Sequence, residues 1–161
     1  DWYHFVTDPS ITGDPAAHVS GEPLQNAPGS FELYPQDFDL VANDLHANAA
    51  ALADEWFGVW ADADAAHRAT RLAAIASPGI RVRDRFSCLT GLDDVDAHIA
   101  ASLRFMPGMS LTRRGDVRHC QGTVLVDWTA NAADGQERGR GTNVFRLGAD
   151  GLIAEVTGFW S

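Results

Sequence analysis

The sequence predicts an α+β domain in which three helices pack on one face of a curved antiparallel β-sheet. Before the Pro107-Gly108 pair, apolar residues recur mainly at the three- and four-residue steps of a helix, and after it they alternate with polar residues as in strands. Two dipeptides typical of tight hairpin turns, Asp134-Gly135 and Asp150-Gly151, interrupt the second half. Helices followed by hairpin-linked strands are characteristic of α+β domains.

The first helix is expected from Phe38 to about Trp60, with Asp37 as its N-cap. Seven apolar residues fall on one face of this helix: Phe38, Val41, Leu45, Ala49, Leu52, Trp56 and Val59. A second helix, capped by Asp62 or Asp64, is expected to run to about Ala76, where Ser77-Pro78-Gly79 stops it.

Strict alternation over Ile80–Phe86 predicts a half-buried strand. Its arginines point to water, and its other face carries Ile80, Val82, Asp84 and Phe86. A third helix is expected from Leu92 to Pro107, because acidic residues in its first turn suit the helix dipole. Four strands complete the chain, at about 111–117, 122–130, 139–147 and 153–160.

Residues 1–37 hold five of the seven prolines and no regular period, so we expect an irregular acidic arm before a domain at 38–161. The arm either covers the domain or a neighbouring subunit, or it is a mobile tail. Because the first residue is Asp1 and not Met, we expect a processed or truncated N-terminus.

The composition excludes several classes of partner. A net charge of −10 argues against nucleic acid or an anionic membrane as a partner. No apolar run is long enough to span a membrane and no signal peptide is evident, so a cytoplasmic location is expected. Two cysteines, Cys88 and Cys120, are too few for a disulfide framework and favour a reducing compartment.

Several short motifs, taken in order, resemble the NTF2-like superfamily, and its SnoaL-like branch most closely, over roughly residues 38–161. They are Trp56-x-x-x-Trp60-x-Asp62, Val82-Arg83-Asp84, Gly91-Leu92-Asp93-Asp94-Val95, Gly141-Thr142-Asn143-Val144-Phe145, and Asp150-Gly151-Leu152-Ile153 leading to Gly158-Phe159-Trp160. The resemblance implies a cone-shaped sheet whose concave face is closed by the helices around an apolar cavity. It also implies a homodimer formed through the outer face of the sheet.

This superfamily contains ketosteroid isomerases, scytalone-type dehydratases, polyketide cyclases, epoxide hydrolases and non-catalytic domains, so the fold alone does not set the function. By resemblance, Asp84 stands where the isomerases keep their general base. Asn143 stands where they keep a protonated aspartic acid that donates to the oxyanion, and where SnoaL-type cyclases keep a catalytic aspartate. The isomerases' helical tyrosine has Trp56 as its nearest counterpart here.

The residues themselves support a similar site. Alternation groups Asn143 with Phe145 and Leu147 on one face of its strand, so one polar residue lies among apolar ones, as Asp84 does in its own strand. An acceptor and a donor in one cavity suit removal of a proton α to a carbonyl and retention of the enolate oxygen. The alternative is that both side chains bond to each other or to the backbone and only shape the core.

Two histidines are candidate assisting groups, His98 on the third helix and His119 beside a strand. His119 shares strand parity with Asp127 and faces outward by that count, although a bulge near Gly122 could reverse it. The candidate substrate-binding residues are aromatic, with core packing as the alternative: Trp56, Trp60, Phe86, Phe105, Trp128, Phe145 and Trp160. We expect no metal, because no histidine–carboxylate cluster has ligand spacing, and no cofactor.

Two functions follow. The first is a cofactor-free isomerase, dehydratase or cyclase that abstracts a proton from a small apolar ring or polyketide-like molecule. The second is a non-catalytic small-molecule-binding or dimerising domain of the same fold.

Overall fold

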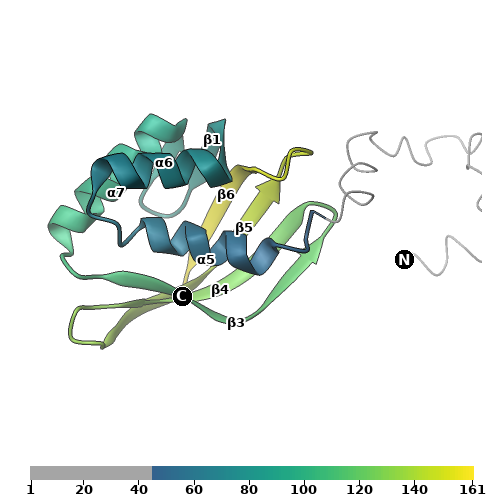
Figure 1. The fold of residues 1–161 in the computed structure, drawn as a ribbon. Coiled ribbons are helices and arrows are strands. Elements are labelled where there is room, and N and C mark those ends of the chain that lie inside the picture. The colour runs from purple at the N-terminus through teal and green to yellow at the C-terminus, as the bar shows by residue number, and fades with distance from the viewer. Residues whose placement is uncertain (1–44) are drawn as a thin grey trace, which may run out of the picture. The chain divides into compact units, whose positions relative to one another are not determined.

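The computed structural model describes residues 45–161 (Figure 1). Three helices are present in this part of the chain: α5 (Ala49–Val59), α6 (Ala65–Ile75) and α7 (Leu92–Phe105). Six strands accompany them: β1 (Ala76–Arg83), β2 (Cys88–Thr90), β3 (Ser110–Cys120), β4 (Thr123–Asn131), β5 (Glu137–Leu147) and β6 (Ile153–Trp160). The acidic arm and the expected domain boundary at residues 37 and 38 lie outside the described residues.

The six strands form one curved sheet in the order β2-β1-β6-β5-β4-β3, with the helices on one side of it (Figure 1). The predicted fold class is therefore confirmed. The sheet is mixed rather than wholly antiparallel, because β1 and β6 run parallel, with Arg83 opposite Thr157. The two predicted hairpin turns are present, and Gly135 and Gly151 both have a φ of +79°, which glycine adopts without strain.

The helix boundaries follow from local chemistry. Asp64 caps α6, since its Oδ1 accepts the backbone N–H groups of Ala66 and His67 at 3.0 Å. The other candidate cap, Asp62, bonds to Arg71 instead. The helix ends at Ile75, and Ser77-Pro78-Gly79 belongs to β1 rather than to a breaker loop. For the first helix, the expected start at Phe38 lies outside the described residues. Residues 45–48, which were expected to be helical, form a turn, so α5 begins at Ala49, and it ends one residue before the expected Trp60.

The core lies between the helices and the inner face of the sheet. Alternate residues of β4 and β5 are buried there, including Val126, Trp128 and Phe145. Trp56 and Phe57 of α5 pack edge-on against Phe145, with ring centroids 6.0 and 6.4 Å apart. In residues 45–161 no helix has the length and apolar character needed to cross a membrane.

Candidate active site

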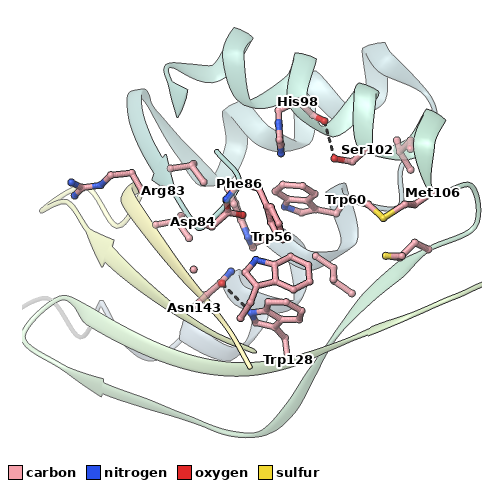
Figure 2. A pocket seen from close by; sticks show the side chains of 17 residues that line it. Trp56, Trp60, Arg83, Asp84, Phe86, His98, Ser102, Met106, Trp128 and Asn143 are labelled. Carbon is pink, nitrogen blue, oxygen red and sulfur yellow. Dashed lines mark hydrogen bonds between the residues drawn. The ribbon is translucent and has the colours of Figure 1, made fainter. Parts of the chain in front are cut away.

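An apolar cavity of about 420 Å³ opens between the helices and the inner face of the sheet (Figure 2). Its volume falls in the range of about 300–1,000 Å³ that is usual for small-molecule sites. Most of its wall is made of large apolar side chains, among them Trp56, Trp60, Leu103, Met106, Trp128 and Trp160. A few polar side chains interrupt this wall, and these are Asp84, Asn143, His98 and Ser102, with Arg83 at the same edge.

Asn143 is a donor whose orientation the protein fixes. It lies on β5 between Val126 of β4 and Gly158 of β6, and only 8% of it is exposed. Its Oδ1 accepts the Trp128 Nε1–H at 3.0 Å (Figure 2). An indole N–H can only donate, so the amide oxygen must face Trp128. The Asn143 NH₂ group is then turned away from Trp128, and it has no hydrogen-bond partner among residues 45–161.

Asp84 is held by a turn that it builds itself. Its Oδ1 accepts the backbone N–H groups of Phe86 and Ser87, each at 2.7 Å, and the Ser87 hydroxyl at 2.9 Å. The Asp84 N–H in turn donates to the Ser87 carbonyl at 3.0 Å. Its second carboxylate oxygen has no hydrogen-bond partner in the described part of the chain. One oxygen thus fixes the side chain, and the other is available to a ligand.

The expected strand through Phe86 is therefore too long. β1 ends at Arg83, because Asp84 folds the next residues into its turn. Phe86 is 67% exposed as a result and does not enter the core, although it still borders the cavity and lies edge-on to Trp160.

Gly158 lies at the point where Asp84 and Asn143 approach each other. A Cβ placed on Gly158 would be 3.2 Å from the Asn143 Oδ1 and 3.2 Å from the Asp84 Cβ. The Asn143 Oδ1 and the Asp84 Cβ are therefore no farther apart than the sum of these two distances. Any side chain at position 158 would push at least one of these two atoms away. Gly158 was not among the predicted site residues, although a glycine inside a strand often marks a close approach of two chain segments.

The α7 wall carries a second polar pair. His98 and Ser102 are one helical turn apart, and the Ser102 hydroxyl donates to the His98 carbonyl at 3.0 Å (Figure 2). The His98 ring lies edge-on to Trp60, with centroids 5.8 Å apart. The Trp60 Nε1 is buried and has no hydrogen-bond partner among the described residues. Ser102 was not predicted, although its i+4 spacing from His98 placed it on the same face.

Three predicted residues do not line the cavity. Phe145 is 1% exposed and packs behind the wall against α5. Phe105 is 86% exposed, because it lies two residues beyond the inward-facing Leu103 and so on the opposite side of α7. His119 is exposed and stacks on His46 with ring centroids 4.3 Å apart, outside the cavity.

Counting alternate residues along the strand also predicted the wrong face of the sheet for His119. The two-residue turn at Gln121-Gly122 pairs Cys120 with Thr123 and so places His119 opposite the inward-facing Val124. The bulge between Arg114 and Arg118, which contains Gly115 with a φ of +73°, leaves the inward and outward faces of β3 unchanged. Asp127 does face outward as expected, and its carboxylate accepts the Thr142 hydroxyl at 2.5 Å. In residues 45–161 no group of three or more His, Cys, Asp or Glu side chains could hold a metal ion.

Helices that close a cavity on one face of a mixed, curved six-stranded sheet define an NTF2-like domain. Solved structures agree. A protein described as a "putative isomerase of the SnoaL-like family" from Agrobacterium tumefaciens matches with a TM-score of 0.66 and 22% identity, over 69% of this chain and 95% of its own. A "putative polyketide cyclase" from Sinorhizobium meliloti matches with a TM-score of 0.54 and 15% identity, over 67% of this chain and 93% of its own.

An NTF2-like protein of unknown function from Exiguobacterium also matches, with a TM-score of 0.55 and 19% identity, over 68% of this chain and 98% of its own. At these identities the similarity establishes the fold alone. The family model of the SnoaL-like domain matches residues 53–156, and the chain therefore belongs to the SnoaL-like family. No curated protein matches the chain.

Proposed function

We propose that this protein is a cofactor-free enzyme that moves a proton on a small apolar ring or polyketide-like ketone, as an isomerase, dehydratase or cyclase does. The observation that carries the proposal is that the Asp84 and Asn143 side chains meet beside Gly158, in the wall of an otherwise apolar cavity. An acceptor and a fixed donor in one cavity match the two demands of enolisation.

In the proposed reaction the free carboxylate oxygen of Asp84 removes a proton from the carbon next to the ketone. The electron pair of the C–H bond moves into a C=C bond, and the carbonyl becomes an enolate. The Asn143 NH₂ donates to the enolate oxygen and stabilises its charge. The protonated Asp84 then returns the proton to the same carbon or to a conjugated one, so that no external acid or oxidant is consumed.

The apolar wall supports this chemistry in two ways. It accommodates a ring or acyl chain without hydrogen-bonding demands of its own. A ring that fills the cavity also displaces water from the enolate, so that a fixed donor is worth more there than it is in water. Because Trp128 holds the amide oxygen, the NH₂ group needs no reorientation when the enolate forms.

The test uses 2-tetralone, an apolar two-ring ketone, in deuterated buffer, with NMR to follow exchange of its α-protons. We expect the protein to accelerate exchange over buffer and Asp84→Asn to lower the rate by about 10²-fold or more, as for loss of a general base. This variant removes the base and keeps the turn, because an asparagine Oδ1 can still accept all three hydrogen bonds of the turn. Unchanged exchange in folded Asp84→Asn removes Asp84 from the mechanism.

A second function is favoured by one specific observation. The three hydrogen bonds to Oδ1 give Asp84 a structural role that would exist without catalysis. On that basis the domain would bind apolar molecules without turnover. It predicts that 2-tetralone binds, that it exchanges no faster than in buffer, and that Asp84→Asn leaves its affinity unchanged.

A further inference from the structure

The α7 wall of the cavity has hydrogen-bonding groups that the proposed proton transfer does not use. His98 is half-buried, and its ring has no hydrogen-bond partner in the described part of the chain. The hydrogen of the Ser102 hydroxyl is committed to the His98 carbonyl, so its oxygen can only accept from a ligand. His98, by contrast, can donate or accept according to its tautomer.

Trp60 adds an independent observation on the same wall. Its indole N–H is buried with no acceptor among residues 45–161, which is unfavourable and rare in a folded protein. Its ring lies between His98 and Trp56 (Figure 2), with centroids 5.8 and 6.1 Å from theirs. Trp60 therefore places a donor without an acceptor next to the His98 ring.

Together these groups match one functional group, the hydroxyl. A ligand hydroxyl can donate to the Ser102 oxygen while it accepts from His98 or Trp60. A carbonyl could not use the Ser102 oxygen, because it has no hydrogen to donate. The Asn143 NH₂ belongs to the sheet wall of the cavity and not to the α7 wall. It can only donate, and therefore suits a carbonyl or enolate oxygen.

We propose that the cavity recognises two oxygens, and that the substrate is an apolar ring molecule with an enolisable carbonyl at one end and a hydroxyl at the other. The carbonyl faces Asn143 and Asp84, and the hydroxyl faces His98, Ser102 and Trp60. This inference rests on the proposed function and narrows its substrate class to hydroxylated cyclic ketones and their phenolic tautomers. The apolar side chains between the two ends contact the ring skeleton.

The test compares three probes by calorimetry: naphthalene, 2-naphthol and 2,6-dihydroxynaphthalene, which carry no oxygen, one, and two at opposite ends. One hydrogen-bonded group adds about 0.5–1.5 kcal/mol, so each added hydroxyl is expected to tighten binding by roughly 2- to 12-fold. The single hydroxyl of 2-naphthol can bind at either end. The gain from the second hydroxyl needs both ends at once, so in Asn143→Leu, His98→Phe and Ser102→Ala it should fall to the small statistical advantage of a molecule with two equivalent ends.

The variants are matched to separate polar from packing effects. His98→Phe keeps an aromatic ring against Trp60 and removes both nitrogens, and Ser102→Ala removes one oxygen. Ser110→Ala is the control, because Ser110 lies at the start of β3 and does not line the cavity. It should bind all three probes as the wild type does. Thermal melts of each variant establish that it is folded before binding is compared.

The outcomes separate this inference from the proposed function. Equal affinity of wild-type protein for 2-naphthol and 2,6-dihydroxynaphthalene overturns the second position and leaves proton transfer untouched. A second gain that persists in both His98→Phe and Ser102→Ala assigns it to other groups and also overturns the inference. Failure of all three probes to bind overturns the cavity as a ligand site, and with it both proposals. Loss of exchange in Asp84→Asn tests the chemistry alone.

Discussion

Replacing Trp128 with phenylalanine tests whether the hydrogen bond to Asn143 fixes the donor. The substitution keeps an aromatic ring in the core and removes the N–H that reaches Oδ1 at 3.0 Å. Both residues are nearly inaccessible, at 3% and 8% exposed, so the amide oxygen is left buried without its partner. An unsatisfied buried acceptor costs about 1–3 kcal/mol. The low end is expected, because the cavity beside Asn143 can admit water.

Trp56→Phe is the matched control for this substitution. Trp56 is equally buried, at 1% exposed, and its indole N–H has no hydrogen-bond partner among the residues that the structure describes. Both variants lose the same ring volume, so their difference isolates the hydrogen bond. Urea unfolding should give a midpoint for Trp128→Phe that is lower by roughly 0.5 M, given a slope of about 2 kcal/mol per molar.

The same variant should slow α-proton exchange of 2-tetralone. Once Oδ1 is released, the amide can present either its oxygen or its NH₂ to the enolate. The donor is disordered but not removed, so the loss should be smaller than the roughly 10²- to 10³-fold cost of deleting an oxyanion donor. Equal stability of the two tryptophan variants, together with an unchanged exchange rate, would refute the reasoning that Trp128 positions Asn143.

Two further predictions follow from other contacts. Gly158→Ala should lower the exchange rate by about tenfold or more with little change in unfolding free energy, because its Cβ would lie 3.2 Å from both Asp84 and Asn143 and reacting groups tolerate little misplacement. Gly79→Ala, whose Cβ would meet nothing within 4 Å, should leave kinetics unchanged, and equal rates in the two alanine variants would contradict this account of the site. Arg71 hydrogen-bonds to Glu55 and Asp62, and lowers the pKa of both carboxyls below their ordinary values of 4.5 and 3.8. Their contribution to stability is therefore present above about pH 4.5 and lost as the pH falls further, so Arg71→Met should flatten the acid side of a stability–pH curve, and an unchanged slope would show that the pairing is energetically neutral.

Local periodicity was sufficient for the elements that depend on neighbouring residues. The alternation in β5 placed Asn143 and Phe145 on the inner face, and both are buried there. The acidic first turn located the start of α7 at Leu92. These signals are strong because a strand or an amphipathic helix that is buried on one face has an apolar residue on that face at every period.

The misses arose where a single contact overrides the period. Asp84 ends its strand through hydrogen bonds to residues two and three positions ahead, so the expected inward position of Phe86 was lost. The two-residue turn at Gln121-Gly122 pairs His119 with the inward-facing Val124, so a parity count carried across the turn gave the wrong face. Trp128 and Asn143 are 15 residues apart, and no local pattern predicts that one would orient the other. The parallel pairing of β1 with β6 is likewise set by the whole chain.

That parallel pair has a consequence for how the chain matures. Of the six strands in residues 45–161, β6 is the last to be synthesised, yet it lies in the interior of the sheet between β1 and β5. The ion pair between Arg83 and Glu155 joins residues 72 positions apart. Until β6 emerges from the ribosome, β1 and β5 both present open edges, and open edges invite aggregation. The nascent domain therefore cannot complete its sheet, or bring Gly158 next to Asp84 and Asn143, until β6 has been translated.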